Sequence, residues 1–260
     1  MKVLLTFAVE PEFAPFRKLR DFDDRRVGDI TVHQAQVGQA TVDVVVTGMG
    51  PANAARALEV VTVEPHTICI CSGFCGALQA RYVPGDIIAA RAVRQLKNNK
   101  TLQSSWGLVE QARADGAKEA QMFFTSDRIV STKEEKARLA PFADAVDMES
   151  FAVFAVAAQK KLPAVAIRVV SDRFDQDMAV DFATTVDDRG AVKLGGVLKH
   201  VASHPIQIPA LIRLGRESKS AAQRLANFLE AYIKKLSMTT HAAVPEELVD
   251  VATRESRKVN

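Results

Sequence analysis

The stretch Val146–Asp172, VDMESFAVFAVAAQKKLPAVAIRVVSD, decides the fold. Within it, Ser150–Lys161 carries apolar residues at helical spacing, and Ala164–Val170 is an apolar run typical of a strand buried on both faces. Glu149 precedes the helix and Asp172 follows the strand. Because ligands bind beyond the carboxyl ends of strands in open α/β sheets, we expect both carboxylates to face one crevice. Paired carboxylates are common in acid–base chemistry on a sugar or a base.

The same alternation of apolar runs and helical stretches extends along the chain. Helices are predicted at Ala52–Val61, after Pro51, and at Ser220–Leu236. Strands are predicted at Val3–Val9, Thr31–Val37, Val42–Thr47, Thr67–Ser72 and Ile87–Val93. Polar Leu96–Ala117 is expected to leave the sheet. The pattern predicts a single α/β domain over 1–238, with a mixed, mostly parallel central sheet flanked by helices, and a partly disordered tail over 239–260.

Composition excludes several classes of protein. The 260 residues are 48% hydrophobic and 25% charged, which is normal for one large globular domain. A net charge of +3 is too small and dispersed to indicate nucleic-acid binding. No run reaches the roughly 18 apolar residues of a transmembrane helix, and the N-terminus resembles a first strand more than a signal peptide.

The cysteines Cys69, Cys71 and Cys75 predict a cytoplasmic location, because an odd number without a signal peptide indicates reduced thiols. As metal ligands they have only His66 nearby, so we expect them to be small core residues. No metal site is predicted.

Two glycine-rich segments follow predicted strands. Thr47–Asn53 opens a helix, and Ser72–Leu78 is expected to form a second turn. The first is not a dinucleotide fingerprint, because Asn53 stands where the third glycine belongs. Each segment reads either as ordinary connectivity or as one wall of a crevice.

The acidic residues also have two interpretations each. Glu12 is either a base on water or a solvated acid in a first helical turn. Asp147 and Glu149 are either ligand groups or partners of a helix dipole, and Ser171-Asp172 is either a site or a helix cap. Their occurrence together with both glycine segments favours a site.

With these motifs assembled, the chain resembles the purine nucleoside phosphorylase and 5′-methylthioadenosine/S-adenosylhomocysteine nucleosidase superfamily from Met1 to about Asp177. The similar features, in family order, are the acid-rich turn Ala8–Glu12, the glycine turn Gly48–Ala55, the small-residue segment Ser72–Leu78 with Gly85-Asp86, Met148-Glu149, and the strand ending in Ser171-Asp172.

The resemblance implies cleavage of the N-glycosidic bond of an adenine-type purine nucleoside, without a cofactor. Asp172 would protonate or hydrogen-bond N7 of the base, kept protonated by burial, and Glu149 would hold the ribose hydroxyls beside Met148. Glu12 would activate water. Backbone at Ile129 and Val130 would contact the base, and further substrate contacts fall on Gly50, Phe74, Gly76 and Ser171. Carboxylates at both ends of the breaking bond suit its oxocarbenium-like transition state.

Two departures bear on the nucleophile. Phe74 stands where many relatives carry a small or hydroxyl-bearing residue, and Arg17, Arg20, Arg25 and Arg26 fall outside the matching motifs. Together with Glu12, these features favour hydrolysis over phosphorolysis. A nucleoside-binding protein without turnover is the remaining alternative, and the joint presence of Glu12, Glu149 and Asp172 argues against it.

Beyond Asp177, Asp181–Gly190 and His204–Arg216 are more similar to a bacterial branch of hopanoid-associated phosphorylases, which leaves phosphorolysis of an adenosyl-hopanoid open. Pro205–Leu236 mixes apolar and basic residues. It is either a helix packed on the sheet or a stretch in weak contact with a membrane surface. The family likeness also implies a homodimer.

Overall fold

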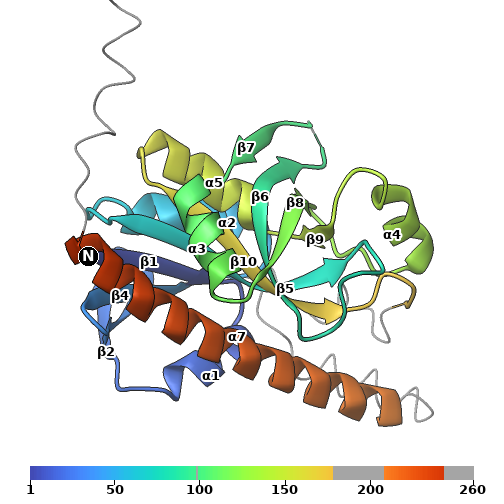
Figure 1. The fold of residues 1–260 in the computed structure, drawn as a ribbon, viewed down its shortest axis with the longest axis horizontal. Helices are drawn as coiled ribbons and strands as arrows, with labels where there is room; N and C mark the ends of the chain where they lie inside the picture. Colours follow the sequence, from blue (N-terminus) through green and yellow to red (C-terminus); the bar gives the residue numbers. More distant parts are fainter. Residues whose placement is uncertain (98, 178–207, 243–260) are drawn as a thin grey trace, which may run out of the picture.

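The structure, a computed structural model, describes residues 1–97, 99–177 and 208–242 (Figure 1). In these residues one ten-stranded mixed sheet is flanked by helices. The strands are β1 (Lys2–Phe7), β2 (Asp23–Val27), β3 (Ile30–Val37), β4 (Ala40–Val46), β5 (Ile68–Ala77), β6 (Ile87–Gln95), β7 (Thr101–Gln103), β8 (Lys118–Thr125), β9 (Ala145–Asp147) and β10 (Ala164–Asp172). The helices are α1 (Glu10–Arg17), α2 (Pro51–Val61), α3 (Trp106–Ala114), α4 (Lys133–Leu139), α5 (Ser150–Gln159) and α7 (Ile208–Ala242).

The sheet combines a closed ring with an open extension. Strands β5, β9, β8, β6 and β10 pair in that order, and β10 pairs back to β5. The extension runs from β5 through β1, β4 and β3 to β2. Strands β4, β1, β5 and β10 are mutually parallel, as are β6, β8 and β9. The predicted α/β domain with a mixed, largely parallel sheet is therefore confirmed.

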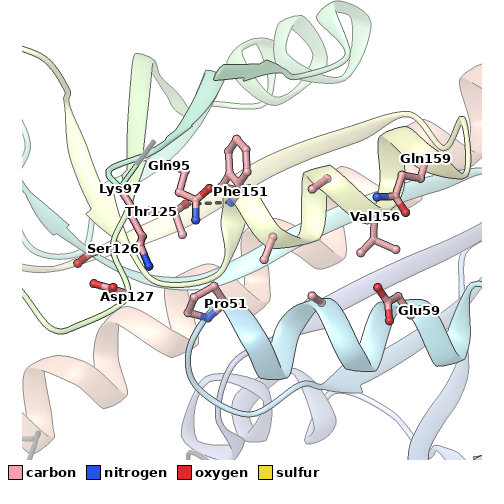
Figure 2. A pocket seen from close by; sticks show the side chains of 13 residues that line it. Pro51, Glu59, Gln95, Lys97, Thr125, Ser126, Asp127, Phe151, Val156 and Gln159 are labelled. Carbon is pink, nitrogen blue, oxygen red and sulfur yellow. Dashed lines mark hydrogen bonds between the residues drawn. The ribbon is translucent and has the colours of Figure 1, made fainter. Parts of the chain in front are cut away.

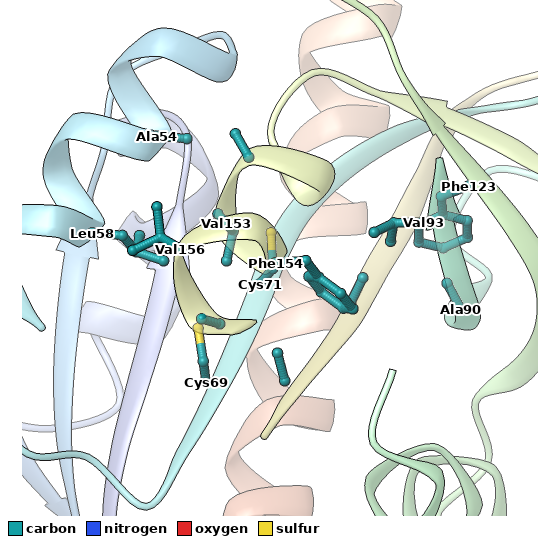
Figure 3. Packing of buried hydrophobic residues seen from close by; sticks show 14 of the residues in the cluster. Ala54, Leu58, Cys69, Cys71, Ala90, Val93, Phe123, Val153, Phe154 and Val156 are labelled. Carbon is teal, nitrogen blue, oxygen red and sulfur yellow. The ribbon is translucent and has the colours of Figure 1, made fainter. Parts of the chain in front are cut away.

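Helices cover both faces of the sheet, and each face has its own core. On one face α2 and α5 pack side by side, with Leu58 and Val153 buried against Cys69 and Cys71 of β5 (Figure 3). On the other face α1, α3 and α7 pack over β1, β4, β5 and β10. All three cysteines are free and buried, and burial raises the pKa of each thiol. They are core residues, as the sequence predicts.

Two expectations about local structure are wrong. Ser72–Leu78 is not a turn, because β5 continues through it to Ala77 and pairs with β10 along its length. Leu96–Ala117 does not leave the sheet. Its β7 pairs with β6, and its α3 buries Leu108, Val109 and Ala112 against the sheet. The elements of this segment are short, and polar residues occupy their solvent-facing positions. The few apolar residues that face the sheet therefore form no clear pattern in the sequence.

The C-terminal helix settles part of the ambiguity over Pro205–Leu236. Helix α7 buries Leu225, Leu229 and Ile233 in the core that covers β1 and β4. Burial of such side chains stabilises a fold by roughly 1.5–3 kcal/mol each. The interpretation as a helix packed on the sheet holds for these residues. The segment Asp181–Gly190 lies outside the described residues, as do residues 204–207 of the segments His204–Arg216 and Pro205–Leu236. No helix in the described parts of the chain is long and apolar enough to cross a membrane.

Candidate active site

Four charged side chains from separate elements meet at one buried point. Glu12 lies in the first turn of α1, Asp147 ends β9, Glu149 is the N-cap of α5, and Arg168 belongs to β10. Each of these residues is at most 5% exposed. They meet near the carboxyl end of β5, because β1 and β10 are its parallel neighbours and β9 pairs antiparallel with its last residues, Gly76 and Ala77.

Glu12 is held by backbone amides. Its Oε2 accepts hydrogen bonds from the N–H groups of Ala8 (2.8 Å) and Val9 (3.2 Å), and its Oε1 accepts one from Phe74 (2.7 Å). The solvated role considered from the sequence is excluded, because the residue is only 4% exposed. Burial raises the pKa of Glu12, while the positive charge of Arg168 and these amides oppose the rise. A carboxylate accepts about four hydrogen bonds, and the described residues supply three donors to Glu12, which leaves one acceptor position for a further donor.

Glu149 reaches from the start of α5 to the glycine turn before α2. Its Oε1 accepts a hydrogen bond from the N–H of Gly50 at 2.9 Å, and its Oε2 lies 3.3 Å from Nη2 of Arg168. Burial raises the pKa of Glu149 to about 7, and the nearby carboxylates Asp147 and Glu12 add to the rise against the effect of Arg168. Glu149 therefore changes charge near neutral pH.

Arg168 is the central cation of the cluster. Its Nε lies 2.9 Å from Asp147, its Nη1 donates to the carbonyl of Phe74 at 3.0 Å, and its Nη2 contacts Glu149 and Ser150. Nearby carboxylates hold the pKa of Arg168 above its usual range despite burial, so it stays charged. An isolated buried charge would be strongly unfavourable, and here three acidic side chains compensate one guanidinium.

The β5 segment Gly73-Phe74 connects the two sides of this cluster. The Phe74 amide donates to Glu12 and its carbonyl accepts from Arg168. Its ring packs toward the core under α1 and α7. Gly73 has φ +135°, and a Cβ there would lie only 2.6 Å from Oε1 of Glu12. The glycine is therefore required by the close approach of the Glu12 carboxylate.

Asp172 ends β10, next to Gly76 in the register with β5. Its Oδ2 lies 2.5 Å from Nζ of Lys136, and its Oδ1 accepts a hydrogen bond from Oγ of Ser171 at 2.7 Å. A Cβ at Gly76 would approach Oδ2 to 3.0 Å, so this glycine makes room for the carboxylate. The burial expected for Asp172 is only partial, and a buried ammonium, that of Lys136, contacts its carboxylate directly.

The remaining predicted contacts occupy the loops around these groups. Met148 and Ile129 are half-buried, and Val130 is buried in a small cluster with Leu78 and Val146. A pocket of about 230 Å³ opens between α2 and α5 and is lined by Pro51, Thr125 and Phe151 among others (Figure 2). It adjoins the acidic cluster, since Pro51 follows Gly50. Among the described residues, no group of His, Cys, Asp and Glu side chains is arranged to hold a metal ion.

The structure adds residues that the sequence did not single out for a role. Arg168 and Lys136 are both fully or almost fully buried cations beside the predicted acids. For Arg168 a signal was present, since a charged residue interrupts the apolar run AVAIRVV. For Lys136 none was visible, because it stands in the charged sequence KEEKAR.

A sheet of this kind with buried acids at the ends of its strands is compatible with the enzymes that cleave N-glycosidic bonds, the nucleosidases and nucleoside phosphorylases. A profile of the phosphorylase superfamily matches residues 2–203. The chain belongs to this superfamily, which confirms the family and the type of enzyme predicted from sequence.

Solved structures with the same fold have low sequence identity. A Helicobacter pylori 5′-methylthioadenosine nucleosidase mutant, with 5′-methylthioadenosine in its active site, has 18% identity and a TM-score of 0.69, covering 90% of this chain and 98% of its own. A Helicobacter pylori futalosine hydrolase mutant has 18% identity and a TM-score of 0.68, covering 90% and 99%. The Streptococcus pneumoniae 5′-methylthioadenosine/S-adenosylhomocysteine nucleosidase has 20% identity and a TM-score of 0.69, covering 91% and 100%. A search of curated proteins finds no match.

Proposed function

We propose that the protein hydrolyses the N-glycosidic bond of a purine nucleoside of the adenine type. The observation that carries the proposal is the buried cluster of Glu12, Glu149 and Arg168, with Asp172 at the end of the same strand as Arg168. Nucleosidases with 5′-methylthioadenosine or its analogues bound are among the structures that share the fold.

Each carboxylate has a distinct role in this proposal. Glu149, beside Met148, accepts hydrogen bonds from the ribose hydroxyls and stabilises positive charge on the sugar as the bond breaks. Glu12 takes a proton from water at its remaining acceptor position, and its raised pKa makes it a stronger base than an ordinary carboxylate. Asp172 gives a proton to N7 of the departing base, which lies against the backbone of Ile129 and Val130.

Electrostatics favour water over phosphate as the nucleophile. Arg168 already has an acceptor at each of its three nitrogens, and Asp147, Glu149 and Glu12 surround its single positive charge. A phosphate dianion entering here would meet three acidic side chains around one guanidinium, whose charge is already shared among them. Water meets no such repulsion. Arg17, Arg20 and Arg25 are engaged elsewhere, with Glu10, Glu230 and Glu64.

One assay tests the proposal. The protein is incubated with adenosine, 5′-methylthioadenosine and inosine, with and without phosphate, and base and sugar products are separated. Free base and the free sugar without phosphate are the expected products. A strict requirement for phosphate with a sugar 1-phosphate product would show phosphorolysis, including that of an adenosyl-hopanoid if only such a substrate reacts. Tight nucleoside binding without turnover would show a binding protein.

We also infer a homodimer in the cytoplasm, on the family likeness and on the reduced state expected of the cysteines. Half-buried Ala55, Phe151 and Ala155 line the pocket between α2 and α5 and leave an apolar surface beside the site. Light scattering of the purified protein at micromolar concentration tests the dimer. A mass of one 28.3 kDa chain would contradict it.

A further inference from the structure

Helix α4 turns a lysine toward the protein interior. Lys136 is the one residue that α4 buries, at 0% exposure, whereas its neighbours Lys133, Glu134 and Arg138 are exposed. A short charged helix normally turns apolar side chains inward. Lysine is among the residues least often buried, and a buried one requires partners. Buried Lys136 must therefore be stabilised by polar groups that it contacts.

The ammonium of Lys136 has three partners, one for each proton. Its Nζ lies 2.5 Å from Oδ2 of Asp172, 2.6 Å from the carbonyl oxygen of Arg173 and 3.1 Å from that of Gln176. Asp172 is the single charged partner among them. The carboxylate is thus held from both sides, by Lys136 at Oδ2 and by the Ser171 hydroxyl at Oδ1.

The helix that carries Lys136 is itself fixed in place. The Thr132 hydroxyl caps α4 by accepting from the Glu135 amide at 3.2 Å, and Glu135 pairs with Arg128 at 2.6 Å. The Lys133 amide donates to Asp177 at 2.8 Å. These contacts anchor both the helix and the segment after β10, so the ammonium is presented to Asp172 in a defined position rather than on a freely moving side chain.

We propose that Lys136 is a positioning residue for departure of the base, acting through Asp172. This inference rests on the proposed function. As the bond between C1′ and N9 breaks, its electron pair goes to the base, and the Asp172 proton passes to N7. The water oxygen bonds to C1′ and its proton passes to Glu12; exchange with solvent returns both acids to their starting states. Lys136 stabilises the carboxylate that Asp172 becomes at that moment.

The test compares two leaving groups. A purine needs protonation to depart, whereas p-nitrophenolate leaves as a stable anion, so p-nitrophenyl β-D-ribofuranoside bypasses Asp172. In Lys136→Met, kcat/KM for the purine nucleoside is expected to fall on the order of 10- to 100-fold more than kcat/KM for the p-nitrophenyl riboside. The control is Lys133→Met, which removes the same charge from an exposed position of the same helix. It is expected to change the ratio of the two rates less than about twofold.

A structural role for Lys136 predicts a different result. If Lys136 only ties α4 to the segment after β10, both substrates lose activity equally, and the proposal is overturned. A second test starts from the Asp172→Asn variant, in which the ion pair with Lys136 is already lost. Adding Lys136→Met to this variant should leave the ratio of kcat/KM for the two substrates unchanged. A further drop in that ratio would show that Lys136 acts independently of Asp172.

The proposed function and this inference fail separately. If the wild type releases no base from any nucleoside, the proposed function is wrong, and the positioning role is then tested by calorimetric binding of adenine. Weaker adenine binding by about tenfold or more in Lys136→Met, with no change in Lys133→Met, supports the role. Equal affinity in all three proteins overturns it. Circular dichroism of each variant confirms that it is folded.

Discussion

Replacement of Gly73 by alanine tests whether the Glu12 carboxylate lies where the structure places it. The new Cβ would lie 2.6 Å from Oε1 and 2.8 Å from Cδ and Oε2 of Glu12, so the carboxylate must shift. The shift breaks at least the 2.7 Å bond from the Phe74 amide, and hydrogen bonds to charged groups contribute about 1.5–3 kcal/mol. Alanine at φ +135° adds about 1–3 kcal/mol of backbone strain.

We therefore expect Gly73→Ala to lower the free energy of unfolding by about 2.5–6 kcal/mol and to abolish most of the activity. Gly116→Ala is the matched control, because Gly116 has φ +103° and a Cβ added there would meet no atom within 4 Å. Gly116 lies between α3 and β8, outside the acidic cluster, so its substitution carries the backbone strain alone. Urea unfolding of both variants measures the difference, expected at about 1.5–3 kcal/mol.

A double-mutant cycle with Glu12→Ala isolates the contact. In that background the carboxylate is gone, so Gly73→Ala should lose only what Gly116→Ala loses, and the coupling free energy should reach about 1.5–3 kcal/mol. The reasoning is refuted if Gly73→Ala unfolds like Gly116→Ala in the wild-type background, or if the cycle gives no coupling.

Three further predictions concern other parts of the molecule. Burial raises the pKa of Glu149 from 4.5 to about 7, so the free energy of unfolding should fall by about 3 kcal/mol as pH rises from about 4 to 8. Between the two pKa values the slope should be about 1.4 kcal/mol per pH unit. Unfolding of Glu149→Gln measured across the same pH range should lack this dependence. Activity should fall on acidification below about pH 7, as Glu149 gains a proton and loses an acceptor for ribose, in a pH profile of kcat/KM. Tyr232→Phe should cost about 1–3 kcal/mol in denaturant unfolding, because the buried hydroxyl donates to the Leu108 carbonyl at 2.8 Å; an unchanged midpoint would contradict this.

The sequence predicts the parts of the fold whose periodicity is strong. Helix α2 begins at Pro51 and turns one face inward, with Ala54, Leu58 and Val61 buried at helical spacing. Strand β10 follows the apolar run to Asp172 and is buried over most of its length. Short elements were missed. Strand β9 has three residues, Ala145–Asp147, and such a strand is defined by its pairing with β5 and β8 rather than by local preference.

Ser72–Leu78 shows why glycine misleads. Two glycines and a serine suggest a turn, but here they let β5 pass close to two carboxylates, Glu12 at Gly73 and Asp172 at Gly76. A glycine that makes room for a side chain distant in the sequence cannot be distinguished, from its neighbouring residues alone, from a glycine that forms a turn. The distinction depends on residues far away in the chain, which a local pattern does not contain.

The same limit applies to charges. Glu12, Glu149 and Asp172 stand at strand and helix boundaries, where their sequence positions indicate a site. Lys136 lies among exposed charges on α4, and only the tertiary structure shows that it contacts Asp172. The local sequence thus indicates the three acids and Arg168, whereas the role of Lys136 is visible only in the tertiary structure.

The placement of α7 has a consequence for synthesis of the chain. Leu225, Leu229 and Ile233 complete a core that begins with Val3 and Leu5 of β1. A ribosome makes that strand first and this helix near the end of the described chain, so the part of this face that α7 covers stays exposed through most of translation, although α1 and α3 cover the rest earlier. Chains stalled before residue 225 should therefore bind chaperones and aggregate more readily than the released protein.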